Sequence, residues 1–427
     1  MKIPKSLRSL SFLWFGSLAG SGSTFVIYMI LARELGPELF GTFSSAMAIT
    51  VVFSLLSGFG IPQVWLKLFG EEGFNALRWV GPSLSYVFLT LVFIGLATGG
   101  IALLQPNDQL SNQLLFLLLG YVSGYVFVQL VGSKLQLEER FVRLTFWQLL
   151  PNLTRLIIIA FLIYLLNYPI SVIEVGWVYA GIGLVFTLMG TTELLAFKNG
   201  KARLKGHEIQ QQLNTPRPTL GEVVRQAWPF GFAGLFAFVY IQSDIIMIKY
   251  ISGDAEAGYY NVAYTVISAI MTIPIILFSK FLIPKYHRWS NQNIERLLEV
   301  STKGSRLMIL AGGAILVGIL VLAPILTSLL FGEKYKPSIL MLNILSLSIP
   351  FTFLAYSYGA TLLTSDHMKL KVKLMGSVAV INILLNIFLI GPYGAPGAAV
   401  STVVSNIILA LLYRHFSRER VFKNVSV

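Results

Sequence analysis

The chain contains no cysteine, and only 12% of its 427 residues are charged. Without cysteine there is neither a disulfide framework nor thiol chemistry. The shortage of charge excludes an ordinary soluble protein, because a water-exposed surface of this size needs far more charged residues. Only four histidines occur, and each falls in an expected connecting segment or in the tail. We therefore expect no bound metal.

What the sequence has in abundance is long uncharged segments. A helix needs roughly 20 apolar residues to cross the hydrocarbon core of a bilayer. The stretches without Asp, Glu, Lys or Arg are 9–32, 39–66, 79–107, 109–133, 257–279, 307–332, 337–365 and 374–413. The last of these contains Gly391-Pro392-Tyr393-Gly394, which divides it into two spans. Three further candidates, near 144–166, 172–197 and 227–251, hold one or a few isolated charges each, so the pattern predicts twelve helices.

The net charge of +13 follows the expected topology. Most of the 32 basic residues fall in alternate connections, and the positive-inside rule then places both termini in the cytoplasm. No nucleic-acid partner needs to be invoked. We expect a multi-pass protein of a bacterial-type plasma (inner) membrane, with an N-terminal six-helix lobe at 1–200, a cytoplasmic linker at 201–226, a C-terminal six-helix lobe at 227–413 and a basic tail at 414–427.

An internal repeat supports the two lobes. At an offset of 217 residues, Gly36 aligns with Gly253 and Gly41 with Gly258. Outside that offset, Ile61-Pro62 and Ile283-Pro284, which end the second and eighth expected helices, correspond loosely. Because each half has an even number of helices, both halves begin on the same side. Such parallel repeats are related by an axis along the membrane normal, and the substrate path is expected between the lobes.

Polar residues recur on one face of several expected helices. In the first helix, Ser21, Thr24 and Tyr28 follow helical spacing. Hydroxyl groups facing a cavity would bind sugars loosely. The alternative is that small and hydroxylated residues let membrane helices pack closely.

The fifth helix carries the most informative polar face. Gln148 and Asn152 share it with Arg155, which lies well inside the span. A guanidinium inside a membrane is costly unless it meets water, a partner or an anion, and its planar fork suits phosphate oxygens. Arg155 is therefore a candidate phosphate ligand, with a structural pair to a carboxylate such as Asp244 as the alternative.

Other charges within or near the spans are less specific. Asp244, two residues after Gln242 in the seventh helix, could bind a coupling proton or sodium ion or serve as a fixed partner for a cation. Lys280 and Arg33 could assist phosphate binding, or they could extend to the membrane interface.

Several segments resemble the polysaccharide-biosynthesis flippases of the Wzx type, which act on O-antigen and exopolysaccharide precursors. The resemblance covers nearly the whole chain and keeps its motifs in order. The segments that carry it are Leu31-Ala32-Arg33-Glu34-Leu35-Gly36-Pro37-Glu38-Leu39-Phe40-Gly41, Asp244 followed by Gly258-Tyr259-Tyr260-Asn261-Val262-Ala263, Phe331-Gly332-Glu333-Lys334-Tyr335 followed by Leu342-Asn343-Ile344-Leu345, and Asn382 to Asn386 followed by Tyr393-Gly394-Ala395-Pro396-Gly397-Ala398-Ala399-Val400-Ser401-Thr402.

The resemblance implies membership of the multidrug/oligosaccharidyl-lipid/polysaccharide exporter superfamily. It implies an all-α, V-shaped bundle like that of multidrug extruders, with a cationic central cavity. The implied substrate is a polyprenyl-pyrophosphate-linked oligosaccharide, flipped from the cytoplasmic to the outer leaflet by alternating access, in company with other polysaccharide-assembly membrane proteins. The alternatives are a cation-coupled multidrug exporter of the same fold and a membrane-embedded glycan polymerase or ligase. Short outer loops disfavour an enzyme.

Overall fold

The computed structural model describes residues 5–106, 108–201, 204, 216–363 and 367–423, and every regular element in these ranges is helical. Between the main helices lie short 3₁₀ or π turns, namely η1 (Gly73–Ala76), η2 (Phe161–Leu165), η3 (Leu277–Leu282), η4 (Glu333–Tyr335) and η6 (Ser417–Val421). The main helices are α1 (Lys5–Gly58), α2 (Ile61–Glu72), α3 (Leu77–Leu104), α4 (Gln109–Leu137), α5 (Phe141–Ala160), α6 (Val172–Lys198), α7 (Leu220–Ser252), α8 (Asp254–Ile276), α9 (Ile283–Gln292), α10 (Ile294–Phe331), α11 (Ser338–Ser346), α12 (Ile349–Thr361) and α13 (Met368–Phe416).

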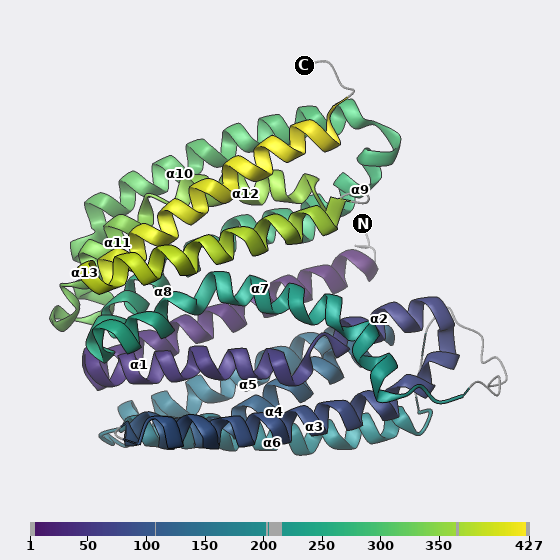
Figure 1. Cartoon of the computed structure of the whole chain (residues 1–427), viewed down its shortest axis with the longest axis horizontal. Helices are drawn as coiled ribbons and strands as arrows, with labels where there is room; N and C mark the ends of the chain where they lie inside the picture. The colour runs from purple at the N-terminus through teal and green to yellow at the C-terminus, as the bar shows by residue number, and fades with distance from the viewer. Residues whose placement is uncertain (1–4, 107, 202–203, 205–215, 364–366, 424–427) are drawn as a thin grey trace. The chain divides into compact units, whose positions relative to one another are not determined.

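The two longest helices are each two helices joined at a glycine. A continuous α1 of 54 residues would be about 80 Å long at 1.5 Å per residue. Gly36, at φ 75° and ψ 173°, instead interrupts α1, and Gly394, at φ 60° and ψ −144°, interrupts α13. Both glycines adopt positive φ values that side chains disfavour. α1 and α13 are therefore helical hairpins (Figure 1).

The described helices give the expected number of passes. Six helical runs are long and apolar enough to cross a bilayer, and the α11–α12 pair, bent by 43°, makes a seventh. Two of these runs, Trp14–Leu104 and Met368–Val421, contain the hairpins α1 and α13. The run Trp14–Leu104 also contains α3. With the two arms of α1, the two arms of α13 and α3 counted separately, and with α7 and α8 added, the described residues form twelve helical passes, as the charge spacing predicts.

The chain divides into two compact units whose boundaries interleave in the sequence. Unit 1 comprises the residues up to Ile27 together with Ala46–Leu235, and unit 2 comprises Tyr28–Ser45 together with Phe236 onward. Residues 28–45, which the sequence assigns to the N-terminal lobe, therefore pack in unit 2, and we call them the exchanged segment. The lobe boundaries expected at 1–200 and 227–413 stay predictions. Of the expected linker, residues 202–203 and 205–215 lie outside the described ranges, and α7 begins at Leu220.

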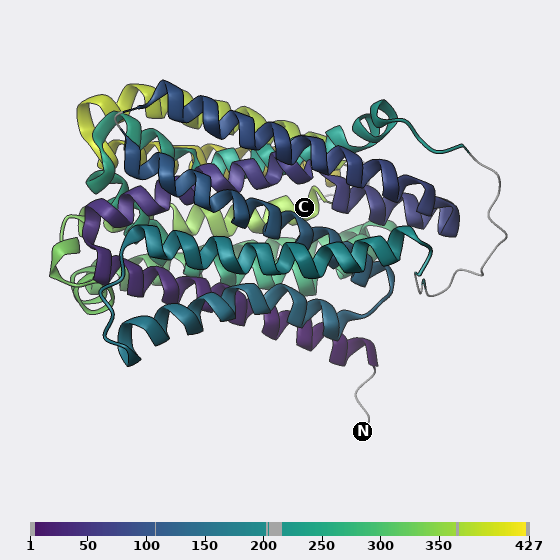
Figure 2. The same ribbon diagram turned by 90° about the horizontal axis from the view of Figure 1, so that it is seen from below.

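Unit 1 is built around the close approach of α4 and α6. A Cβ atom added to Gly124 would lie 2.5 Å from Cα of Gly183, so only glycine permits this backbone contact. One turn further along, the hydroxyl groups of Ser123 and Thr187 form a 2.9 Å hydrogen bond. α3, α4 and α6 run along a common direction (Figures 1 and 2). The crossing fixes the aromatic rings that α4 and α6 carry.

Unit 2 holds the structural counterpart of the sequence repeat. Gly253, at φ 99° and ψ 170°, repeats the backbone conformation of Gly36. A Cβ on Gly41 would lie 1.7 Å from the carbonyl oxygen of Asp254, and a Cβ on Gly258 would lie 2.1 Å from that of Pro37. Since Asp254 is also Pro37 shifted by 217 positions, the contact is reciprocal. Residues 28–45 and the start of α8 are thus related by a local twofold axis.

The loosely corresponding Ile-Pro pairs also have matching positions. Ile61-Pro62 begins α2 and Ile283-Pro284 begins α9, with proline in the first turn of each helix. Proline is tolerated there because the first-turn amides have no partner within the helix. The pairs therefore start short additional helices between spans, where the sequence placed them at the ends of the second and eighth spans.

Candidate functional site

The Arg155 side chain lies in an aromatic corner of unit 1. The rings of Tyr121 in α4 and Tyr179 in α6 are tilted by 40° with centroids 5.8 Å apart. The guanidinium carbon of Arg155 lies 4.8 Å from each centroid, and the residue is 6% exposed. Aromatic faces attract a cation without neutralising it. The corner therefore holds the charge of Arg155 in place and leaves it positive.

The hydrogen-bonding capacity of Arg155 is only partly used. Nη1 donates to Oδ1 of Asn152 at 2.9 Å, and Nε is buried without a partner. Among the described residues no carboxylate forms an ion pair with this guanidinium. Arginine has five N–H donors, and a buried unsatisfied donor costs about 1–3 kcal/mol. An anion that accepted from this edge would remove that cost.

The polar face of α5 turns toward α1. A Cβ on Gly16 would lie 2.2 Å from Cγ2 of Thr145, and one on Gly20 would lie 3.8 Å from Nδ2 of Asn152. The hydroxyl of Thr24 donates to the carbonyl of Gly20 at 3.1 Å. The structure thus brings Asn152 next to the helix face that carries Ser21 and Thr24.

The other predicted residues of unit 1 are not fully buried. Gln148 and Ser21 are exposed, and Asn152 and Thr24 are half-buried. The bond from Thr24 to its own helix is one that hydroxyl residues often make within membrane helices. The assignment of these residues to sugar binding stays a prediction.

Asp244 lies at the centre of a polar network in unit 2. Its carboxylate accepts hydrogen bonds from the hydroxyl of Tyr260 and from Nδ2 of Asn386, both at 2.6 Å, and from the hydroxyl of Thr402. The residue is only 2% exposed. Because Asn386 and Thr402 flank the break at Gly394, the carboxylate joins α7, α8 and both arms of α13. All of these partners belong to unit 2.

The network offers a set of oxygen atoms that suits a hard cation. Oδ1 of Asn386 is buried without a partner, and Oδ1 of Asn382 accepts from Nδ2 of Asn386 at 3.3 Å. Together with the carboxylate and the two hydroxyls, these atoms resemble the ligands that sodium and other hard cations take. In the described residues, no cluster of three His, Cys, Asp or Glu side chains has the geometry of a metal site.

Arg33 has partners of its own in unit 2. Its Nε donates to the carbonyl of Leu330 at 2.8 Å, and its Nη2 donates to that of Leu329, both in the last turn of α10. Such carbonyls have no partner within their helix and carry the negative end of its dipole. The structure therefore gives Arg33 a capping role, while its part in substrate binding stays a prediction.

The remaining predicted residues are placed in part. The ring of Tyr28 makes edge contacts with Phe40 and Phe43, at centroid distances of 5.8 and 6.1 Å. Gln242 is half-buried and lies two residues before Asp244 in α7. The side chain of Lys280, in η3, lies outside the described part of the structure. The substrate-binding roles of all three stay predictions.

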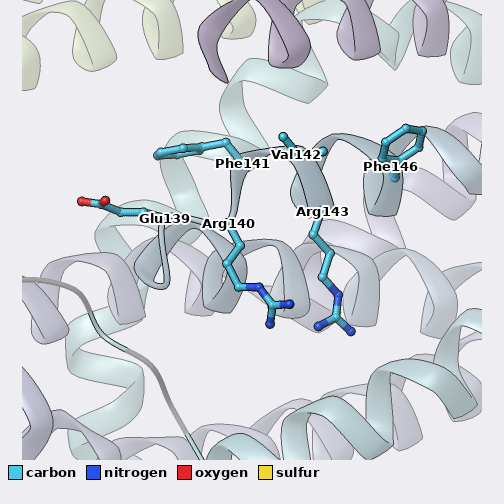
Figure 3. Close-up of a pocket in the computed structure, with 6 residues that line it drawn as sticks. All are labelled: Glu139, Arg140, Phe141, Val142, Arg143 and Phe146. Atoms are coloured by element: carbon cyan, nitrogen blue, oxygen red, sulfur yellow. The ribbon is translucent and has the colours of Figure 1, made fainter. Parts of the chain in front are cut away.

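A second basic hollow lies at the start of α5. It has a volume of about 500 Å³ and is lined by Glu139, Arg140, Phe141, Val142, Arg143 and Phe146. Figure 3 shows Arg140 and Arg143 extending in one direction, away from the apolar side chains. Both already pair with carboxylates, Arg140 with Glu138 at 3.5 Å and Arg143 with Glu193 at 2.5 Å. The charges of this hollow are balanced, which makes it a weaker anion site than the Arg155 corner.

The sequence did not identify the partners that shape these sites. Tyr121 and Tyr179 lie in apolar spans where an aromatic residue is unremarkable, and only the crossing of α4 and α6 brings them together. Tyr260 and Thr402 lie within segments that resemble a known family, so a signal existed for them. That signal did not connect either residue with Asp244.

The family model that matches this chain and two of its relatives carry descriptions that refer to glycan or polysaccharide biosynthesis. A family model described as polysaccharide biosynthesis protein matches residues 6–288. The probable low-salt glycan biosynthesis flippase Agl15 of Haloferax volcanii is 25% identical over 183 residues, which are 42% of this chain and 38% of that protein. The capsular polysaccharide biosynthesis protein CapF of Staphylococcus aureus is 20% identical over 97% of this chain and 100% of its own length.

Solved structures show the same fold over the whole chain. An inward-facing multidrug resistance transporter of the MATE family and MOP superfamily has a TM-score of 0.70 at 16% identity, covering 99% of this chain and 100% of that one. The lipid II flippase MurJ, in an inward closed conformation, has a TM-score of 0.66 at 15% identity, covering 97% and 86%. The expected all-helical membrane fold is confirmed.

Proposed function

This chain belongs to the polysaccharide biosynthesis protein family, and from that premise we propose that it flips a polyprenyl-pyrophosphate-linked oligosaccharide from the cytoplasmic to the outer leaflet. The names of the relatives support a glycan-linked substrate, since one is a glycan biosynthesis flippase and another a capsular polysaccharide biosynthesis protein. A plasma-membrane location with both termini in the cytoplasm belongs to the same proposal.

The observation that carries the proposal is the Arg155 corner. Burying a diphosphate in a membrane is prohibitive without a compensating positive charge. Arg155 is buried, has no carboxylate partner among the described residues, and keeps Nε unsatisfied. The guanidinium would bind phosphate oxygens through its free N–H groups, and Asn152, which already orients it, would contact the adjoining sugar.

Transport would proceed by alternating access. The head group would enter from the cytoplasmic side while the prenyl tail stays in lipid. Gln148, Ser21 and Thr24 would bind sugar hydroxyls weakly, which allows release on the other side. Asp244 would bind the coupling cation, either a proton or sodium, and so link the arrangement of α7, α8 and α13 to an ion gradient.

The proposal is tested with purified protein in proteoliposomes. A short-chain polyprenyl-pyrophosphate disaccharide with a fluorescent sugar is placed in both leaflets, and the outer population is quenched. We expect protein-dependent loss of the protected population. A rate equal to that of empty liposomes, or efflux of a cationic dye in place of sugar translocation, would contradict the proposal and favour a multidrug exporter.

Replacing Asp244 with asparagine is expected to slow translocation about tenfold, since a buried hydrogen bond to a charged group is worth about 1.5–3 kcal/mol and each 1.4 kcal/mol is a factor of ten. The amide keeps the size of the side chain but cannot accept from three donors as a carboxylate does. The same liposome assay, run with and without a sodium or proton gradient, measures the effect.

The gradient comparison separates coupling from packing. Asp244→Asn should lose the dependence on the gradient, whereas Ser243→Ala, which removes a neighbouring 3.4 Å hydrogen bond to Asn382, should keep it. An Asp244→Asn protein that responds to the gradient as the unmodified protein does would exclude Asp244 as the coupling residue.

A further inference from the structure

The first two turns of α13 carry an unusual set of charges. Lys369, Lys371 and Lys373 occupy alternate positions, and the first turn contains no acidic residue. A helix N-terminus is the positive end of the helix dipole, so lysines there are unfavourable. Lys369 and Lys373 are exposed and share a face, whereas Lys371 lies on the other side of the helix and is half-buried.

Lys371 packs along the edge of an apolar cluster in unit 2. Its Nζ lies 5.8 Å from the ring centroid of Tyr413, which is only 3% exposed and belongs to a cluster with Leu362 and Leu409. A Cβ on Gly359 would lie 3.0 Å from Cε2 of Tyr413 and 3.5 Å from Cε of Lys371. Glycine at 359 therefore leaves the room that the lysine stem occupies.

The polar atoms at this place lack acceptors. Lys371 forms no hydrogen bond or ion pair with a described residue, and the hydroxyl of Tyr413 is buried without a partner. Lys249, another lysine drawn inward in unit 2, is 7% exposed and does pair, with Asp254 at 3.0 Å. A half-buried ammonium without an anionic partner and a buried hydroxyl without a partner are each costly. Both groups would be satisfied by an oxyanion.

We propose that Lys371 and the Tyr413 hydroxyl form a second anion site, in unit 2, for the phosphate groups of a prenyl-linked lipid. The inference rests on the proposed function, because that function supplies a diphosphate on a prenyl chain. The partly buried apolar side chains packed against the cluster, such as Leu374 and Phe416, suit the first isoprene units. The ammonium suits the phosphate as a point charge. With Arg155 in unit 1, each unit then has its own phosphate ligand.

The test uses the full chain in nanodiscs of zwitterionic lipid, with geranylgeranyl diphosphate as the probe. Its affinity is measured by the rise in Tm on titration. Lys371→Gln should weaken binding about tenfold, the loss of one charge-assisted hydrogen bond, and Tyr413→Phe about threefold. The matched controls are Lys369→Gln and Lys373→Gln, which remove the same charge from the exposed face of the same helix and should change affinity less than twofold.

Three results would overturn the site. One is an equal loss of affinity in all three lysine variants, which would mean a general field of positive charge. Another is equal binding of geranylgeraniol, which lacks phosphate. The third is inorganic pyrophosphate bound as tightly as the prenyl diphosphate, which would assign the site to a free anion. Lys371→Arg, which keeps the charge, should bind the probe with an affinity within about threefold of that of the unmodified protein. Retained binding in this variant would show that the loss in Lys371→Gln comes from the missing charge and not from misfolding at this position.

The outcome is separable from that of the proposed function. Probe binding that is unchanged in Lys371→Gln, with liposome translocation intact in the unmodified protein, would reject the second site and leave the flippase proposal standing. Probe binding that depends on Lys371, without any translocation of the lipid-linked sugar, would reject the flippase proposal and leave the anion site.

Discussion

Replacing Arg155 with alanine is expected to lower the translocation of lipid-linked sugar about 100-fold. Two charge-assisted hydrogen bonds from the guanidinium to a phosphate, at about 1.5 kcal/mol each, correspond to two factors of ten. The aromatic corner cannot replace them, because the ring faces of Tyr121 and Tyr179 attract a cation and do not attract an anion. The proteoliposome assay measures this at equal protein incorporation.

Two further variants define what the loss means. Arg155→Lys keeps the charge and loses the planar fork and its stacking, so we expect an intermediate loss of about tenfold. Arg225→Ala, on the exposed start of α7, removes a guanidinium that contacts neither site and serves as the control. Translocation by Arg155→Ala at the rate of Arg225→Ala would reject Arg155 as the phosphate ligand. A common fall in Tm in both Arg155 variants with unchanged rates would assign Arg155 to stability alone.

Replacing Gly41 with alanine is expected to destabilise the protein by about 3 kcal/mol, the upper part of the range for overpacking. The added Cβ would lie 1.7 Å from the carbonyl oxygen of Asp254 and 2.9 Å from the amide nitrogen of Gly258. Both obstacles are backbone atoms, which cannot rotate away as a side chain could. Residues 28–45 would have to separate from the start of α8. The measurement is Tm in detergent, with the yield of folded protein as a second reading.

A matched control lies in the same helix. Gly22 has nothing within 4 Å of an added Cβ, so Gly22→Ala should keep or raise Tm, as alanine is the better helix former by about 1 kcal/mol. Gly258→Ala should reproduce the fall seen with Gly41→Ala, because the contact is reciprocal. A Gly41→Ala protein as stable as Gly22→Ala would show that residues 28–45 and the start of α8 do not cross at these glycines.

The features predicted correctly from sequence were those set by solvation and by backbone sterics. Uncharged stretches of membrane length fixed the twelve passes, since each span must satisfy its own backbone hydrogen bonds. The 217-residue offset identified Gly36 and Gly253, because a positive φ requires glycine in both copies.

What the sequence could not show depends on how helices pack. Nothing in the residue pattern indicated that residues 28–45 leave unit 1, since the lobes were divided by chain order. The polar face of the fifth helix singled out Arg155, but its two tyrosines come from other helices. The sequence pattern does not distinguish Lys371 from Lys369 and Lys373, and only its burial against Tyr413 separates it from them.

The exchanged segment 28–45 bears on how a chain of this kind could arise by duplication. A half-length ancestor would carry the same hairpin, and the reciprocal contact of Gly41 with Gly258 would then join two identical subunits across an isologous interface. In the present chain the same interface would be the internal contact of residues 28–45 with the start of α8, both of which belong to unit 2. We accordingly expect a six-helix half of the chain, expressed alone, to form a dimer.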